Sequence, residues 1–363
     1  MSSTQAKPPQ TELAVPVYLP HWRSRLYAIL GLSLVLGIAM AFAATIGSVH
    51  IPFLTTGQVL LSKLPLVKIT PTWPETTETI IMAMRLPRVI LAGLVGAALS
   101  IAGATYQGLF RNPLADPYLI GVAQGAALGA VIGFLLPYHG QAVGFGIIQV
   151  LAFAGAVISV SIVYLLARVG KTLPVTTLIL AGVALGALWG SVVSFLILTS
   201  GQAMQGIIFW LMGSFSSSQW SEVRVVLPYV VLGVAVILLY SRSLNVMQLD
   251  EEQAQQLGIN VEKVKLILLA AATLMTAAAV SFVGIIGFVG IIIPHMVRLM
   301  WGPDYRLLLP MSVLTGAIFM VVADLLARTV LAPTEMPVGI ITAVCGVPFF
   351  LYLLRRKKRA VFF

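Results

Sequence analysis

The sequence predicts an all-α, polytopic membrane protein with ten transmembrane helices, and three observations predict this class. The 363 residues are 59% hydrophobic, with a mean hydropathy of +1.00. Only 9% of them are charged, whereas soluble domains carry roughly a quarter of charged residues. The apolar residues also gather into long runs, and a helix that spans a bilayer needs about 20 of them.

Ten apolar segments follow one another along the chain, and no soluble domain interrupts them. They are Leu26–Val49, Val89–Phe110, Tyr118–Leu136, Val143–Ala167, Val175–Leu198, Val225–Tyr240, Val264–Phe282, Ile285–Met300, Leu307–Val330 and Pro337–Leu354. An even number of spans places both termini on the same side of the membrane. Two rows of glycines, Gly121 to Gly133 and Gly182 to Gly190, recur at every fourth residue and predict close helix packing.

The distribution of lysine and arginine predicts that both termini are cytoplasmic. With this orientation only six of the 22 basic residues lie outside, which leaves 16 inside, in agreement with the positive-inside rule. The outer six are Lys63, Lys68, Arg85, Arg88, Arg224 and Arg328. Basic cytoplasmic loops also explain the net charge of +10 without nucleic-acid binding.

We expect three regions along the chain. Residues 1–22 are polar and rich in proline and form a disordered cytoplasmic tail. Residues 23–356 form the ten-helix domain, and residues 357–363 form a basic cytoplasmic tail.

Several functions lack the residues that they require. The four histidines have no metal-ligand spacing and Cys345 is the single cysteine, so we expect no metal site and no cofactor. Gly170-Lys171-Thr172 resembles the end of a phosphate-binding loop, but the glycine required five positions earlier is Leu165. Charges within the spans are nearly confined to Asp324 and Arg328, which do not form a proton relay. The energy for transport should therefore come from a partner.

Residues 247–260 (MQLDEEQAQQLGIN) lie on the inner side between the sixth and seventh segments. Asp250, Glu251 and Glu252 open this stretch, where a helix N-terminus favours acids, and Gly258 closes it as a C-terminal glycine. The pattern predicts a short surface helix. It is either a structural linker or a docking helix for a cytosolic motor, and the absence of a motor in the chain favours docking.

Two arginines, Arg85 and Arg88, stand on the outer side just before the second segment. The helix dipole disfavours a cation at this position by roughly 0.3–1 kcal/mol each. Pro87 fits a helix start. The arginines either extend to lipid headgroups or form a cationic socket for an acidic external partner, and the socket explains their position better. Arg328 can join this socket, although pairing with Asp324 competes with that role.

The turn after the second segment is Arg111-Asn112-Pro113-Leu114-Ala115-Asp116-Pro117. Each Asx-Pro pair offers a cap followed by a proline that starts a helix. Such a rigid turn is explained by structure alone, and it can also act as a gate at the inner mouth of a path.

These residues are part of a wider resemblance. The stretches 85–129 (beginning RLPRVILAGL), LGINV at 257–261, 287–310 (GFVGIIIPH…), ADLLAR at 323–328 and 335–356 (EMPVGIITAV…) closely resemble the iron–siderophore/haem/cobalamin permeases of type II ABC importers. The resemblance runs from about Leu26 to Arg356. It implies the type II importer fold, a second permease subunit that is identical or a paralogue, two cytosolic ATP-binding subunits and an outer substrate-binding protein.

The resemblance also implies roles for individual residues. Docking of the binding protein falls on Arg85, Arg88 and Arg328. Coupling to the ATPase falls on the inner helix, at Asp250, Glu251, Glu252, Gln256, Leu257 and Gly258. The translocation gate falls on Asn112, Leu114, Val175 and Thr176.

The resemblance therefore implies a transport subunit rather than an enzyme, in a bacterial inner membrane and in contact with lipid. The expected cargo is an iron(III)–siderophore complex, because most of the resembling family carries one, with cobalamin or haem as alternatives. An ion-coupled secondary transporter is a weaker alternative. An intramembrane enzyme is disfavoured, because clustered histidines and carboxylates are lacking within the spans.

Overall fold

The computed structural model describes residues 22–47, 49, 51–63, 70–137, 141, 142 and 145–361. Residues 1–21 of the expected N-terminal tail and residues 362 and 363 lie outside this range. The helices are α1 (Trp22–Thr45), α2 (Phe53–Ser62), α3 (Glu75–Thr79), α4 (Leu86–Leu109), α5 (Val122–Leu135), α6 (Ile147–Ala167), α7 (Val175–Thr199), α8 (Met204–Leu211), α9 (Trp220–Leu239), α10 (Ser241–Val246), α11 (Glu251–Gln256), α12 (Val261–Val283), α13 (Val289–Trp301), α14 (Tyr305–Thr329) and α15 (Val338–Val361). A two-residue pair, β1 (Gln141–Ala142) and β2 (Phe145–Gly146), joins α5 to α6.

Each of the ten predicted segments coincides with a helix, and the all-α class is confirmed. Within the described residues, seven helices have the length and composition to cross a membrane. The other three segments correspond to α5, α13 and α15, whose apolar portions are shorter. The chain is thus a multi-pass membrane protein.

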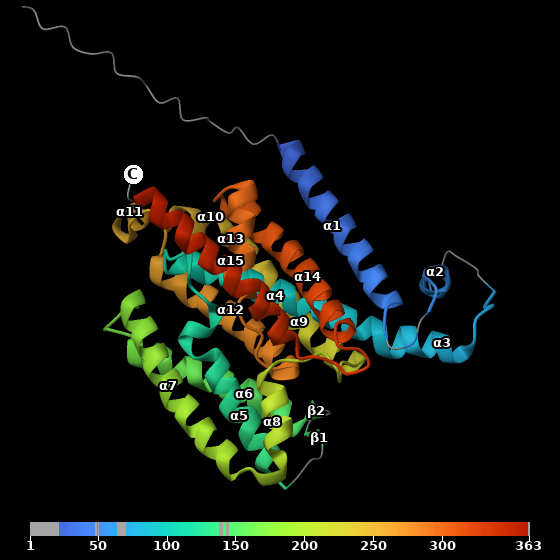
Figure 1. The fold of residues 1–363 in the computed structure, drawn as a ribbon. Helices are drawn as coiled ribbons and strands as arrows, with labels where there is room; N and C mark the ends of the chain where they lie inside the picture. Colours follow the sequence, from blue (N-terminus) through green and yellow to red (C-terminus); the bar gives the residue numbers. More distant parts are fainter. Residues whose placement is uncertain are drawn as a thin grey trace, which may run out of the picture.

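Helix α4 lies at the centre of the bundle. It packs against α14, α12, α13 and α9, and nearly all of its side chains are buried. Glycines permit this crowding: a Cβ atom added at Gly96 would lie 2.2 Å from the Gly316 carbonyl oxygen on α14. In Figure 1, α4 runs through the middle of the molecule, while α1 and α7 lie on its periphery.

Helices α5 and α6 form the tightest peripheral pair, and the first glycine row explains why. Gly125 and Gly129 face α6, where added Cβ atoms would lie 2.4 Å from the Gly155 carbonyl oxygen and 1.9 Å from that of Leu151. The predicted close packing is therefore confirmed for this row. Gly121 precedes α5, with a φ of 84°.

The second predicted span begins earlier than Pro87. A continuous helix runs from Glu75 to Leu109, and it contains a π-helical stretch, η1 (Ile80–Arg85), immediately before α4. Pro87 has no N–H and cannot donate a hydrogen bond to a carbonyl one turn back. The wider π turn changes the hydrogen-bond register at this point. The expectation that Pro87 starts the helix was wrong, because a lone proline does not distinguish a start from a register change.

Polar contacts join the helix ends into two groups. At the Asp304 end, Asp304 precedes α14 and bonds Arg25 of α1 at 2.8 Å and Asn245 of α10 at 2.7 Å. This end also holds α11, the end of α4 and the start of α12. At the Arg328 end, Arg328 of α14 contacts the last turn of α1. The two groups correspond to the inner and outer sides that the loop charges predict.

Candidate functional site

The predicted short helix at the Asp304 end is present as α11 (Glu251–Gln256). Its C-terminus has the geometry of a Schellman motif: Gly258 has a φ of 84°, its amide donates to the Gln255 carbonyl, and the Ile259 amide donates to Ala254. The role predicted for Gly258 as a C-terminal glycine is thus confirmed. Glu251 and Glu252 occupy the first turn, where the helix dipole favours carboxylates.

Exposed apolar side chains flank α11, and a groove adjoins it. Leu249 is 46% exposed and Leu257 is 64% exposed, while Glu252 and Gln256 beside them are also exposed. A groove of about 400 Å³ adjoins the helix, and it is lined by Gln255 and residues 258–262. Two exposed leucines thus flank the short helix, with a groove beside its C-terminal end.

Two ion pairs tie α11 to neighbouring segments. Asp250 pairs with Arg111 at 3.0 Å, and both side chains are largely exposed. Glu251 pairs with Lys265 of α12 at 2.9 Å, where the lysine side chain is only 5% exposed. The second link is therefore buried on its lysine side, while Glu251 is 41% exposed.

The predicted gate turn after α4 is rigid for an unexpected reason. Arg111 has a φ of 48°, and the Asn112 amide donates to the Gln107 carbonyl, so a Schellman motif ends α4 with arginine where glycine is usual. The Asn112 side chain accepts a hydrogen bond from the Leu114 amide at 3.0 Å. Leu114 is partly exposed at the tip of the turn.

Asp116 completes this turn by capping the short helix η2 (Pro117–Ile120). Its carboxylate accepts from the Tyr118 amide at 2.8 Å. Burial raises the pKa of Asp116 to about 6, and the hydrogen bond from Tyr118 offsets only part of the rise. The turn therefore contains a carboxyl group that titrates near neutral pH.

Val175 and Thr176 form the first turn of α7, beside the gate turn. The residue before Pro174 is Leu173, and both of its backbone groups are held by α12. Its amide donates to Glu262 at 2.8 Å, and its carbonyl accepts from Lys265 at 3.2 Å. A hollow of about 10 Å³ separates Val175 and Leu173 from the end of α4. The structure therefore brings the entrance of α7 next to the end of α4, which directly precedes the predicted gate turn.

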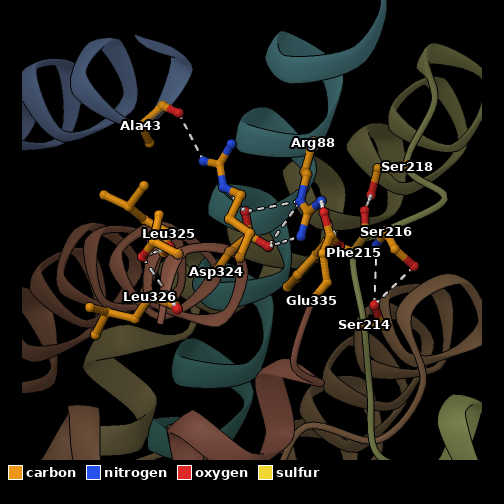
Figure 2. A network of polar contacts seen from close by, with 12 residues as sticks. Ala43, Arg88, Ser214, Phe215, Ser216, Ser218, Asp324, Leu325, Leu326 and Glu335 are labelled. Atoms are coloured by element: carbon orange, nitrogen blue, oxygen red, sulfur yellow. Dashed lines mark hydrogen bonds and ion pairs between the residues drawn. The ribbon is translucent and has the colours of Figure 1, made fainter. Parts of the chain in front are cut away.

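At the Arg328 end, Arg88 lies between two carboxylates (Figure 2). Its guanidinium donates to Asp324 at 2.9 and 3.0 Å and to Glu335 at 2.9 Å. The Arg88 side chain is 12% exposed and that of Asp324 is 2% exposed, whereas Glu335 is 39% exposed. The cluster opens to the surface through Glu335.

Arg85 and Arg328 cap the C-terminus of α1. The last four carbonyls of a helix lack partners within it. Arg328 donates to the Ala43 carbonyl at 2.8 Å, Arg85 donates to those of Ala44 and Thr45, and the Thr45 hydroxyl donates to that of Phe42 at 2.7 Å. All four carbonyls are thus satisfied, and the two cations lie at the negative end of the helix dipole, where positive charge is favourable.

These contacts revise the picture of a cationic socket. The structure does bring Arg85, Arg88 and Arg328 to one end of the bundle, but each is largely buried with partners within the chain. The predicted competition from Asp324 is present, because Arg328 lies 3.4 Å from its carboxylate. Docking at these arginines stays a prediction.

Sequence reasoning missed Glu335 and Lys265. Glu335 follows α14 in a loop and carries no local pattern that links it to Arg88. Lys265 stands three residues after Glu262, a spacing that permits an ion pair on one helix face. The pair with Glu262 could therefore have been predicted from the sequence.

Comparisons with known proteins give the family. Residues 34–356 match the model of the FecCD transport family. The chain is 52% identical to the cobalamin import system permease protein BtuC of Halobacterium salinarum, over 79% of this chain and 77% of that protein. It is 40% identical to the Fe(3+) dicitrate transport system permease protein FecD of Escherichia coli, over 77% of this chain and 86% of that protein.

A solved structure agrees with this family. A metal-chelate type ABC transporter in an inward-facing conformation superposes with a TM-score of 0.76 at 31% identity, covering 90% of this chain and 98% of that one. Family, fold and relatives point to one kind of protein: the chain belongs to the FecCD transport family and is the membrane-spanning permease subunit of an ABC importer, with ATP hydrolysis supplied by a separate subunit.

Proposed function

We propose that the chain imports a metal chelate and that cobalamin is the first cargo to test. The observation that carries this choice is the 52% identity to a permease named for cobalamin import. An iron(III)–siderophore complex is the second candidate, favoured by the 40% identity to a ferric dicitrate permease.

In the proposed assembly the chain spans a bacterial inner membrane. The Asp304 end faces the cytoplasm, and both termini are cytoplasmic. The excess of basic residues on this side supports the orientation. Each of two permease subunits, identical or paralogous, seats α11 on one of two ATP-binding subunits. The exposed Leu249 and Leu257 beside a groove support α11 as the docking element.

The proposed inner gate consists of the turn with Asn112 and Leu114 and the α7 entrance with Val175 and Thr176. The assignment is supported by the hollow that Val175 lines together with Leu109 and Phe110, just before the turn, and by the Arg111–Asp250 pair that places the turn beside α11. When the ATP-binding subunits move α11, the two segments separate and the cargo leaves toward the cytoplasm.

The proposed outer docking step is an exchange of carboxylates on Arg88. Glu335 is the exposed partner of Arg88, and an acidic side chain of a binding protein can replace it without leaving the buried arginine unpaired. Arg85 and Arg328 hold α1 in place beneath this exchange.

Uptake into proteoliposomes tests the cargo. The permease is reconstituted with the ATP-binding and substrate-binding proteins encoded beside it, and radiolabelled cobalamin, a ferric siderophore and haem are supplied in parallel. ATP-dependent uptake of cobalamin alone supports the first candidate, and uptake of the ferric siderophore alone replaces it with the second. Uptake driven by an ion gradient without the ATP-binding subunits would contradict the importer mechanism.

Binding-protein affinity tests the exchange at Arg88. Glu335→Gln removes the competing charge and should tighten docking several-fold, whereas Arg88→Met should weaken it. Arg224→Met is the matched control, because Arg224 is exposed and, among the residues that the structure describes, bonds only the Trp220 carbonyl within its own helix. Unchanged affinity in both Glu335→Gln and Arg88→Met would remove Arg88 from the docking surface.

A further inference from the structure

Lys265 occupies a position that local helix energetics disfavour. It is the fifth residue of α12, whose N-terminal turn is capped by the Asn260 side chain. A cation near a helix N-terminus opposes the dipole, and burial of an ammonium group removes its hydration. Lys265 is nevertheless 4% exposed. Its surroundings must therefore compensate for both effects.

Three acceptors surround the ammonium group, one for each of its protons. Lys265 Nζ lies 2.9 Å from Glu251 Oε1, 3.1 Å from Glu262 Oε1 and 3.2 Å from the Leu173 carbonyl oxygen. These acceptors come from three different segments: α11, α12 and the loop that enters α7. A single side chain thus joins the helix proposed to bind the ATPase to one of the proposed gate segments.

The contact with the α7 loop is a two-point clamp. Glu262 accepts from the Leu173 amide at 2.8 Å while Lys265 donates to the carbonyl of the same residue. Pro174 and the first turn of α7 follow directly, so displacement of Leu173 displaces Val175. Leu173 is therefore bonded to α12 through both of its backbone groups.

The other connection from α11 is weaker. Arg111 and Asp250 are 41% and 77% exposed, and exposed ion pairs contribute little to stability. Lys265 is buried and bonds three acceptors, so its charge is less screened by solvent and ions than that of Arg111.

We propose that Lys265 is a positioning residue that transmits motion of α11 to the inner gate, by making α11, the start of α12 and the α7 loop move as one body. This proposal rests on the proposed role of α11 in binding the ATP-binding subunits. It assigns the transmission step to a residue outside the docking surface itself.

Lys265→Met removes the ammonium group and keeps a side chain of similar length, and Glu251 and Glu262 remain partly exposed to water after the change. The matched control is Lys263→Met, because Lys263 is an exposed lysine in the same turn of α12. Lys265→Arg is the conservative variant, since it restores a cation with several donors.

The first measurement uses the assembled importer in proteoliposomes. We expect Lys265→Met to retain the ATP-binding subunits and basal ATP hydrolysis, but to lower the cargo moved per ATP hydrolysed at least tenfold. Lys263→Met should match the wild type and Lys265→Arg should recover most of the loss. A wild-type ratio in Lys265→Met would overturn the proposal.

The second measurement separates this proposal from the docking role of α11. Spin labels at Gln256 and Thr176, both exposed, are placed on the permease alone in nanodiscs, in a Cys345→Ser background. The distance distribution should be narrow in the wild type and in Lys263→Met, and clearly broader in Lys265→Met. Equal widths would refute the clamp even if α11 binds the ATPase, whereas retention of the ATP-binding subunits by a Leu257→Asp variant would refute docking through α11 and leave this result intact.

Discussion

The cap on α1 gives the sharpest stability prediction. Helix α1 packs mainly along α14, and most of its surface is free of contacts within the chain. Its C-terminus depends on Arg328, which donates to the Ala43 carbonyl at 2.8 Å and to the Ile46 carbonyl at 3.0 Å. The perturbation is Arg328→Met, which keeps the aliphatic stem and removes both donors.

The magnitude follows from these two bonds. A hydrogen bond to a charged group contributes about 1.5–3 kcal/mol, and Asp324 keeps Arg88 as a partner, so no carboxylate is left unpaired. Because Arg85 still caps two neighbouring carbonyls, we take the lower end, about 3 kcal/mol for both bonds. This corresponds to a roughly hundredfold larger population of the opened helix end.

Hydrogen–deuterium exchange of residues 38–46 in nanodiscs measures this opening. Exchange there should quicken about a hundredfold in Arg328→Met, while α12 and α4 stay unchanged. Arg224→Met is the control, because the hydrogen bond of this exposed side chain, 3.3 Å to the Trp220 carbonyl, stays within one turn of α9. Exchange of residues 38–46 at the wild-type rate would show that the cap does not hold α1.

Three other predictions concern turns and packing. Asp116→Asn should leave thermal stability unchanged at about pH 3 but raise it at pH 7, by up to about 3 kcal/mol, because a carboxyl whose pKa is raised to about 6 destabilises the fold as pH rises from 4 through 6 and the asparagine stays neutral. Gly258→Ala should cost α11 about 1 kcal/mol, seen as faster amide exchange in residues 251–257, since its φ of 84° suits glycine. Gly129→Ala should sharply reduce folded protein in size-exclusion chromatography, because the new Cβ would lie 1.9 Å from the Leu151 carbonyl oxygen, whereas Gly186→Ala, with 3.6 Å to its nearest neighbour, should not.

The sequence was most informative where the determining pattern is local. Ten apolar runs predicted ten helices, because one long run is sufficient to identify each of them. The acids and the glycine of residues 250–258 likewise mark the start and the end of α11 within nine residues. The start of the second span was wrong because Pro87 permits either a helix start or a π turn, and the choice depends on tertiary packing.

The charged clusters could be predicted only in part. Arg85 and Arg88 were singled out on the expectation of a helix N-terminus, whereas both lie within the helix that runs from Glu75 to Leu109. Arg85 bonds backbone carbonyls of α1, and Arg88 bonds carboxylates more than 200 positions away. Any residue supplies a carbonyl, so no residue type indicates that α1 is the acceptor. The Glu262–Lys265 pair was within reach of pattern reasoning, whereas the contact with Leu173 spans 92 positions and uses its backbone.

The two ends of the bundle use buried cations in different ways, and the difference bears on function. At the Arg328 end, Arg85 and Arg328 bond the carbonyls of one helix terminus, so they fix α1 against the bundle. At the Asp304 end, Lys265 bonds acceptors from three different segments. A cap of the first kind resists motion, because its acceptors belong to one rigid element. A link of the second kind transmits motion, because its acceptors belong to different elements and one side chain couples their movements. An importer driven from its cytoplasmic side needs the second kind of contact at the end that carries α11.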